Sequence, residues 1–389
     1  MRLAILTSEY PPLTPYDGGI GSLYAPLAPN LARLDQDVHV FALTHDDESV
    51  EDHDGVHVHL VPPARSPIRR YLEPVAWSAS VARAVRHAGP FDVVMAPEWF
   101  GSAYAYSRRR DAGPLVTHLC TSLAQVVELN GGWPRFPRLF DRRVQNHLER
   151  RQTERSDTIF TLSQAVLEWA ARLWEIDDVP AHQVPSAIDV AEVRGLGDGD
   201  PPASFPDRGP RVVFFGRLEP LKGVDALVQA MSSVWDRFPG APLVMLGGDD
   251  EVMGERLRGL AGPNAEHIHM LGFVSRAHLL ASVRQADVVA LPSLWETFTV
   301  AGLEAMALGR PVVLTAVGGT PEFCTDGVDS LLVPPSDPEA LGGAIVRLLE
   351  DTELRERMGS QAAKTAEQYD VPAVAPRYVS AFEDLLAGR

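Results

Sequence analysis

The sequence RVVFFGRLEPLKG (211–223) joins a short apolar run to a glycine-bounded loop that carries an arginine and a lysine. A continuous apolar run of this length is typical of a buried strand, and the pattern VDALVQAMSSVW (224–235) that follows is typical of a helix. Arg217 and Lys222 are therefore expected on a strand-to-helix loop. The lysine stands out because the chain of 389 residues has only one other, Lys364.

The same alternation of short β-rich runs with helical patterns extends over the whole chain, which predicts parallel sheets with helices on both faces. The predicted strands are 2–8, 37–43, 56–61, 91–96, 114–119 and 157–162 in the first half, and 211–216, 241–247, 267–272, 286–292 and 311–316 in the second. We therefore predict an α/β protein with two Rossmann-like, doubly wound domains that face a ligand cleft.

The stretch GLGDGDPPASFPDRGP (195–210) is dense in Gly, Pro and Asp and predicts a linker. The expected organisation is an N-terminal domain over 1–195, a linker over 196–210 and a C-terminal domain over 211–373. The carboxyl ends of the strands in both domains are where ligand-binding loops are expected.

The composition excludes several classes of protein. Asp and Glu number 52 against 35 Lys and Arg, for a formal net charge of −17, which argues against a nucleic-acid partner. Two cysteines, far apart, argue against a disulfide framework and a zinc site, and fit a reducing compartment. The N-terminal apolar run is too short for a signal peptide, and no run approaches the ~18 apolar residues of a membrane span. A cytoplasmic protein is expected.

The loop with Arg217 and Lys222 suits a diphosphate, because arginine offers a planar fork of donors and lysine a mobile point charge. The alternative is a pair of solvated surface charges.

A second candidate stretch is LPSLWETFTVAGLEAMALGRPVV (291–313). Glu296 precedes its helix and Glu304 lies about one turn inside. A threonine of this loop can cap the helix, and the amides near Thr299 and Val300 then form an anion site. Carboxylates on either side of such a site suit the hydroxyls of ribose or a hexose. The alternative is a capping role for Glu296 and an exposed helix position for Glu304.

The first half offers a glycine loop, GGIG (18–21), after its first strand. Gly18 and Gly19 would let the backbone approach a phosphate or sugar closely. The pattern differs from GxGxxG, so a dehydrogenase is disfavoured. A flexible turn explains the glycines equally well.

Three further residues follow strands in the first half. His118 ends the strand 114–119 at its carboxyl edge, where we expect it to face the cleft, although a lone histidine is more often structural. Glu98 and Trp99 follow the strand 91–96 and could offer a hydrogen bond and a stacking surface to a sugar-like acceptor; the alternative for the tryptophan is the core.

The stretch RFPRLFDRRVQNHLERRQTER (135–155) contains seven arginines. It fits either an ordinary helix with a solvated face or a basic amphipathic segment in contact with an anionic membrane. The ordinary helix is favoured.

Together these stretches resemble the retaining nucleotide-sugar glycosyltransferases of family 4, whose two-Rossmann architecture is called GT-B. The resemblance extends over essentially the whole chain and is strongest over 211–335. The motifs there are FFGRLEPLKG, LGGDD, LGFV, LPSLWETFTVAGLEAMALGRPVV, GGTPEF and DGVDSLLVPPSD, in that order.

The resemblance implies roles for the matching positions. Arg217 and Lys222 would bind the donor diphosphate and stabilise charge on the leaving group, so that neither a metal nor a cofactor is needed. Glu296 would bind the donor sugar, and Glu304 the ribose hydroxyls. Further contacts are implied for the backbone at Thr299 and Val300 (diphosphate), Phe273 and Val274 (base pocket), Gly19 (phosphate or acceptor) and His118 (transferred sugar). The last segment, 374–389, would pack back onto the first domain.

Two departures from the family pattern affect the expected site. Thr297 and Thr299 stand where the family commonly has glycine, so a side chain there could narrow the approach of the donor. Pro26 and Pro29 should kink or shorten the helix after GGIG. The GGTPE loop (318–322) has no assigned role.

The function that the resemblance implies is retaining transfer of a hexosyl-type sugar from a nucleoside diphosphate sugar to a hydroxyl of an unidentified acceptor, which could be a glycan, a natural product or a lipid. Uridine is the default base. The alternatives are a nucleotide-sugar epimerase or hydrolase on the same architecture, and a non-catalytic binding protein. The two glutamates, the Arg217–Lys222 loop and His118 argue against the last of these.

Overall fold

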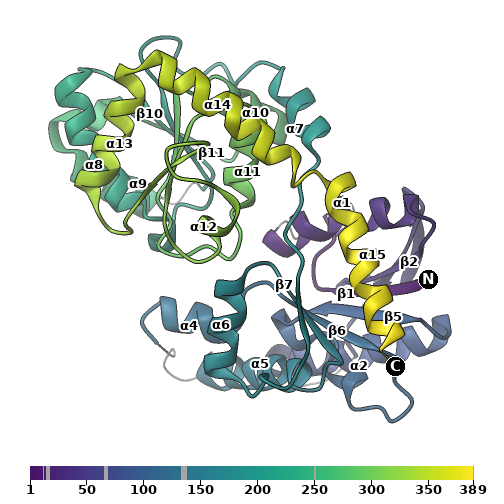
Figure 1. Ribbon diagram of the computed structural model, residues 1–389. Helices are drawn as coiled ribbons and strands as arrows, with labels where there is room; N and C mark the ends of the chain where they lie inside the picture. The colour runs from purple at the N-terminus through teal and green to yellow at the C-terminus, as the bar shows by residue number, and fades with distance from the viewer. Residues whose placement is uncertain (12, 15–17, 65–68, 133–137, 249–250, 389) are drawn as a thin grey trace. The chain divides into compact units, whose positions relative to one another are not determined.

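The computed structural model describes residues 1–11, 13–14, 18–64, 69–132, 138–248 and 251–388 (Figure 1). The chain divides into two compact units. The first consists of Met1–Ala187 together with Val371–Arg389, and the second is Ile188–Asp370. Each unit has its own mainly parallel sheet with helices packed against it.

The first unit is built on an eight-stranded sheet in the order β3-β4-β2-β1-β5-β6-β7-β8. All described neighbours are parallel except β3, which runs antiparallel to β4. The strands are β1 (Arg2–Thr7), β2 (Asp37–Leu43), β3 (Ser49–His53), β4 (Val56–Val61), β5 (Val93–Pro97), β6 (Leu115–Leu119), β7 (Thr158–Thr161) and β8 (Ala181–Gln183). The chain reverses its direction of travel across the sheet between β1 and β5, which makes their carboxyl ends the ligand-binding edge of this fold type.

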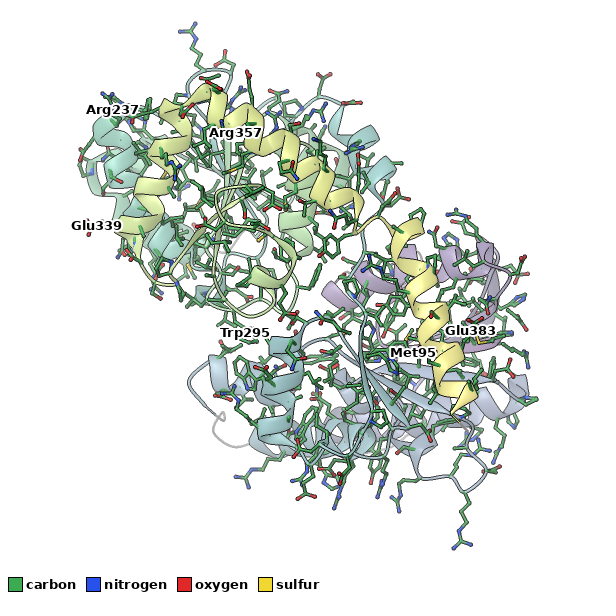
Figure 2. The ribbon with its side chains drawn as sticks, viewed as in Figure 1. Met95, Arg237, Trp295, Glu339, Arg357 and Glu383 are labelled. Atoms are coloured by element: carbon green, nitrogen blue, oxygen red, sulfur yellow. The ribbon has the colours of Figure 1, made fainter. Side chains whose placement is uncertain are left out.

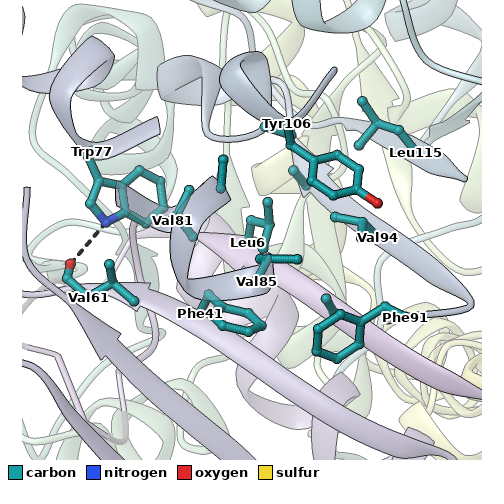
Figure 3. Close-up of a cluster of buried hydrophobic side chains, with 14 of the residues drawn as sticks. Leu6, Phe41, Val61, Trp77, Val81, Val85, Phe91, Val94, Tyr106 and Leu115 are labelled. Atoms are coloured by element: carbon teal, nitrogen blue, oxygen red, sulfur yellow. Dashed lines mark hydrogen bonds between the residues drawn. The ribbon is translucent and has the colours of Figure 1, made fainter. Parts of the chain in front are cut away.

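Helices pack on both faces of this sheet. The helices of the unit are α1 (Gly19–Arg33), α2 (Arg69–Ala88), η1 (Trp99–Gly101), α3 (Tyr104–Ser107), α4 (Leu123–Leu129), α5 (Arg138–Thr153), α6 (Gln164–Leu173) and α15 (Val371–Ala387). Figure 3 shows the core under α2, where Trp77, Val81 and Val85 meet strand residues such as Phe41 and Val94. The indole of Trp77 donates to the carbonyl of Val61 at 3.0 Å, so this buried N–H is satisfied.

The C-terminal helix α15 belongs to the first unit and contacts α1 (Figure 1). Its Phe382 stacks on Phe160 of β7, with ring centroids 5.2 Å apart. Figure 2 labels Glu383 on this helix and Met95 on β5 of the same unit. The end of the chain is thereby part of a core formed by residues more than two hundred positions earlier.

The second unit has six parallel strands in the order β11-β10-β9-β12-β13-β14. Its strands are β9 (Val212–Phe215), β10 (Leu243–Leu246), β11 (Ile268–Gly272), β12 (Val288–Leu291), β13 (Val312–Thr315) and β14 (Leu331–Val333). This is the 3-2-1-4-5-6 order of dinucleotide-binding sheets, and its switch point lies between β9 and β12. The alternation in sequence thus predicted the right fold class.

Most helices of the second unit lie in the connections between these strands. The helices are α7 (Val190–Gly197), η2 (Pro220–Lys222), α8 (Val224–Arg237), α9 (Glu251–Ala261), η3 (Gly262–His267), α10 (Arg276–Arg284), α11 (Val300–Ala307), α12 (Thr320–Phe323), α13 (Pro338–Glu350) and α14 (Thr352–Glu367). Of these, α7 precedes β9, and α13 and α14 follow β14. The unit begins at Ile188, whereas the sequence suggested a boundary at 195 and a linker over 196–210. The reason is α7, which packs on α10 and α11.

Two segments of the first unit have a structure that their composition alone does not indicate. The acidic run DDESVED (46–52) has the composition of a solvated loop, but Ser49–His53 form the edge strand β3, with most of its side chains exposed. Pro26 and Pro29, which were expected to kink or shorten the first helix, both lie inside α1 and do not end it, because the helix spans 15 residues. The side-chain amide of Asn30 donates to the carbonyl of Pro26 at 2.9 Å and adds a hydrogen bond in this part of the helix.

Within the described residues, the helices are all too short or too polar to cross a lipid bilayer.

Candidate functional site

The most complete candidate site lies at the switch point of the second unit, where the loops after β9 and β12 meet. Strands β9 and β12 are neighbours, with Val212 opposite Val288. The two loops are tied together because the amide of Leu294 donates to the carbonyl of Leu221 at 2.8 Å. Arg217 and Lys222 come from the first loop, and Glu296 from the second.

Gly223 allows these loops to approach each other closely. It has φ +67°, and a Cβ atom there would lie 1.9 Å from the carbonyl oxygen of Pro292. A side chain is therefore excluded by both the backbone conformation and the space available. This contact explains why the stretch 211–223 ends in a glycine.

Lys222 and Glu296 form an ion pair across the two loops. The Nζ of Lys222 lies 2.8 Å from Oε1 of Glu296, and the hydroxyl of Ser293 donates to the same oxygen at 2.6 Å. The side chains are only 26% and 14% exposed, so they are shielded from bulk water more than most surface pairs. The pair also explains how a carboxylate can stand beside an anion site.

Arg217 lies on the same loop but is much more accessible. Its side chain is 76% exposed, and its guanidinium pairs with Glu219 at 3.0 Å. Arg217 and Lys222 thus lie at the same edge of the sheet. Lys222 forms its ion pair with Glu296 of the second loop, whereas Arg217 pairs with Glu219 of its own loop.

The backbone of Glu296 is supported by the GGTPE loop, for which the sequence suggested no role. The amide of Gly319 donates to the carbonyl of Glu296 at 3.0 Å. Gly318 has φ +51°, and a Cβ atom there would lie 1.9 Å from the same carbonyl oxygen. The two glycines therefore fix the position of the Glu296 backbone.

Helix α11 begins beside this pair. Its N-cap is Thr299, whose hydroxyl accepts from the amide of Gly302 at 3.1 Å. The first turn, starting at Val300, carries amides that have no carbonyl partner within the helix. Such an N-terminus favours an anion through its N–H groups and dipole. The side chain of Thr299 is 4% exposed, and its hydroxyl is turned back onto its own helix.

Glu304 lies within α11 and is almost fully buried, not exposed on the helix surface. Its carboxylate is 2.8 Å from the guanidinium of Arg276, the first residue of α10. Burial lowers the pKa of Arg276, but the charges and hydrogen bonds of Glu304 and Glu192 outweigh it and raise the pKa above its usual value. Arg276 was not among the residues predicted from the sequence, although it follows the LGFV motif by two residues. In that motif Phe273 is 75% exposed and Val274 is half-buried, at the carboxyl end of β11.

The glycine loop of the first unit carries an acidic partner of its own. Gly18 is the N-cap of α1, and Gly19 is the first residue of that helix. The carboxylate of Glu9 accepts from the amide of Gly21 at 3.1 Å, and a Cβ atom on Gly18 would lie 2.5 Å from Oε2 of Glu9. A carboxylate of this chain thus sits at the helix end where a phosphate was expected.

The side chain of His118 is buried in the first unit, whereas the sequence suggested that it faces the cleft. It is fully buried between helices α1 and α15, and its Nδ1 and Nε2 lie 3.3 Å and 3.5 Å from the hydroxyls of Tyr24 and Tyr378. Burial lowers the pKa of His118 to about 3, so the ring is neutral. Side chains alternate between the faces of a strand, and His118 points to the face opposite that of Leu115, which packs under α2.

The side chain of Glu98 is also buried in the first unit, whereas the sequence suggested a hydrogen bond to an acceptor. It is 1% exposed, and both carboxylate oxygens accept from the amide of Cys120, at 3.0 and 2.8 Å. Burial raises the pKa of Glu98 to about 7. It therefore joins the ends of β5 and β6. Trp99, next in sequence, is half-buried at the start of η1.

The arginine-rich stretch forms α5 from residue 138, and 135–137 lie outside the described residues. One face of α5 is buried through residues such as Leu148 and Gln152. On the other side, Arg150 and Arg151 pair with Glu154 at 2.5 and 3.0 Å. These contacts support the interpretation as an ordinary amphipathic helix.

Two family profiles match successive parts of the chain. The profile described as Glycosyltransferase Family 4 matches residues 17–192, and the profile described as Glycosyl transferases group 1 matches residues 200–365. The chain belongs to this group 1, family 4 class of glycosyltransferases. The resemblance identified from the sequence is thereby confirmed.

Individual proteins extend this comparison. The phosphatidyl-myo-inositol mannosyltransferase of Mycobacterium leprae is 35% identical over 217 residues, which are 55% of this chain and 56% of that protein. The chain therefore spans about half the length of this relative.

Two solved structures match nearly the whole chain. The sucrose-phosphate synthase of Thermosynechococcus elongatus has a TM-score of 0.79 at 22% identity, with 100% of both chains covered. HepE of Anabaena in complex with UDP has a TM-score of 0.71 at 18% identity and covers 99% of this chain and 100% of its own. At these identities the likeness concerns the fold, and it confirms the predicted GT-B architecture.

Proposed function

We propose that this protein transfers a hexosyl residue from a nucleoside diphosphate sugar to a hydroxyl group of an acceptor, with retention of the anomeric configuration. The observation that carries the proposal is the Lys222–Glu296 pair, 2.8 Å apart, at the switch point of a dinucleotide-type sheet and beside the N-terminus of α11. Membership of the family supports the same reaction.

In this proposal the diphosphate binds against Arg217, Lys222 and the first turn of α11. Bond cleavage at the sugar carbon leaves an extra negative charge on the departing diphosphate. Cationic side chains and helix amides fixed in position stabilise that charge without the reorganisation that water would need. Because two cations are present on one loop, catalysis needs no metal ion.

Glu296 then acts on the donor sugar. When a diphosphate binds Lys222, the carboxylate of Glu296 becomes available to accept hydrogen bonds from sugar hydroxyls, while Ser293 and the 318–319 loop hold it in place. Glu304, oriented by Arg276, is proposed to accept from the ribose hydroxyls. The exposed ring of Phe273 is proposed to stack on the base.

Uridine is the proposed base, supported by the UDP bound to the structural relative HepE. The acceptor is proposed to bind the first unit. We assign neither His118 nor Glu98 a direct contact with substrate, because both side chains are buried and engaged by other residues of the unit.

The test is a panel of UDP-, GDP-, ADP- and dTDP-sugars, followed by thermal shift and by product analysis. The proposal predicts that donors with one of the four bases raise the melting temperature of the protein, and that sugar is released or transferred only from those donors. A product sugar with the donor's anomeric configuration, identified by NMR, is expected. Conversion of the donor into an isomeric nucleotide sugar would favour the epimerase alternative, and stabilisation by none of the four would refute the proposal.

A further inference from the structure

A cluster of histidines and aspartates lies in the first unit at the opposite edge of the sheet from the strand ends considered above. Asp37 is the first residue of β2, and His39 follows two positions later on the same face. His57 of β4 lies directly opposite His39 in the parallel register, and Asp52 of β3 lies opposite His57. The strand pairing alone therefore brings these side chains together.

Three of these residues can reach a common point. One ligand atom from each of Asp37, His39 and His57 lies within 4.8 Å of the others. Oδ1 of Asp37 is 3.1 Å from Nε2 of His39 and 3.9 Å from Nε2 of His57. Ligand atoms around a tetrahedral zinc ion are about 3.3 Å apart, given bonds of about 2.0–2.1 Å. Side-chain rotations that bring the ligand atoms about 1.5 Å or less closer together would therefore produce the tetrahedral spacing.

The other nitrogen of each imidazole already has a partner. Nδ1 of His57 lies 2.5 Å from Oδ1 of Asp52, and Nδ1 of His39 lies 2.9 Å from Nε2 of His59. In metal sites the non-ligating nitrogen of a histidine is usually held by a carboxylate or another polar group, which fixes the ring orientation. Both rings here are held so that Nε2 is directed toward Asp37.

We propose that Asp37, His39 and His57 bind one divalent transition-metal ion of the zinc class. Two imidazole nitrogens and one carboxylate oxygen suit Zn²⁺ and its neighbours, whereas Mg²⁺ and Ca²⁺ require mainly oxygen ligands. The absence of cysteine spacing had argued against zinc from the sequence, but histidines on adjacent strands supply the ligands. The site is separate from the proposed donor site, and its role is structural: it joins β2, β4 and, through Asp52, the edge strand β3.

Arg2 is the neighbouring group that opposes a cation. Its Nε donates to Oδ2 of Asp37 at 3.0 Å, which leaves Oδ1 for the ion. Its terminal nitrogen lies 3.3 Å from Nε2 of His39 and must move aside when a metal binds. The proposal therefore predicts that R2Q binds the ion more tightly than the unchanged protein, because a positive charge is removed from the site.

The experiment uses the full chain with any affinity tag removed, treated with EDTA, dialysed, and titrated calorimetrically with ZnCl2 and, separately, MgCl2. We expect one zinc per chain with a micromolar or lower dissociation constant, and no response to magnesium. At 100 times that constant, zinc should raise the melting temperature of the unit by about 5–10 °C.

His57→Ala is the test variant, and His53→Ala is its matched control, since His53 lies on β3, contacts Asp54 and takes no part in the cluster. His57→Ala should weaken zinc binding at least tenfold and lose the thermal shift, while His53→Ala should keep both. Melting without metal shows whether each variant is folded, and D37N provides a second ligand variant with no change in side-chain size. The proposal would be overturned if the unchanged protein bound no zinc, or if the His57 and Asp37 variants bound zinc as tightly as the unchanged protein.

Discussion

Replacement of Lys222 by methionine separates its two proposed roles. The substitution keeps an unbranched side chain but removes the ammonium group, which lies 2.8 Å from Glu296. Loss of one charge-assisted contact to the leaving diphosphate should lower turnover by about 10²–10³-fold, since fixed donors to a developing charge contribute about 3–4 kcal/mol. Loss of the partly exposed ion pair should cost only about 1 kcal/mol of stability, or about 2–4 °C in melting temperature for a unit of this size.

The assay is release of the nucleoside diphosphate from the preferred donor, with circular dichroism melting in parallel. Lys364→Met is the matched control, because Lys364 is the only other lysine and is exposed on α14. It should behave as the unchanged protein.

The double variant K222M/E296Q distinguishes catalysis from pairing. It removes the unpaired carboxylate, so most of the lost stability should return, whereas turnover should stay low. Turnover of K222M within about threefold of the unchanged protein, or recovery of turnover in the double variant, would refute the leaving-group role of Lys222.

Two more predictions follow from the geometry of the two units. Gly318→Ala should displace the carbonyl of Glu296 and lower turnover at least tenfold. The control is Gly327→Ala, because Gly327 also has a positive φ but has open space around it; this variant should change only stability, by about 1 kcal/mol. Equal turnover in the two variants would contradict this prediction. In the first unit, burial raises the pKa of Glu98 to about 7 and that of Glu149 to about 8, from 4.5. The folded unit therefore binds these protons more tightly than the unfolded chain, so their stabilising contribution is complete below about pH 4.5 and is lost as the pH rises through 7 to 8. The free energy of unfolding in urea should fall less between pH 5 and pH 8 for Glu149→Gln than for the unchanged protein. An equal or larger fall in the variant would show that Glu149 does not cause the pH dependence.

The fold could be predicted from the sequence because the buried strands are short continuous apolar runs. The strands at 37–43 and 56–61 were predicted at their observed limits. The edge strand at 49–53 was missed because its side chains are mostly exposed and only Val50 is apolar, so that it has no apolar alternation to detect. Its backbone pairing with β4 determines its structure.

The candidate site was predictable only in part. The loops that carry Arg217, Lys222 and Glu296 follow predicted strands, and position in a parallel sheet is enough to bring such loops to one edge. The pairing of Lys222 with a residue 74 positions away, and of Glu304 with Arg276, depends on three-dimensional contacts that no local pattern encodes.

His118 shows what the position of a residue at the end of a strand does not predict. A strand end indicates which edge of the sheet a residue occupies, but not which face its side chain points to. Here that face is covered by α1 and by α15, which comes from the far end of the chain, and the histidine is enclosed between two tyrosines. Burial by a helix so distant in sequence could not be read from the strand itself.

We propose above that the cationic loop of the second unit binds the diphosphate of a nucleotide sugar. A crystal structure of the protein with the nucleoside diphosphate selected by the donor panel tests this most directly. We expect phosphate oxygens within about 3 Å of Nζ of Lys222 and of the first-turn amides of α11, and a Lys222–Glu296 distance greater than the 2.8 Å found here. A nucleotide bound at another edge of the sheet, with that ion pair intact, would contradict it.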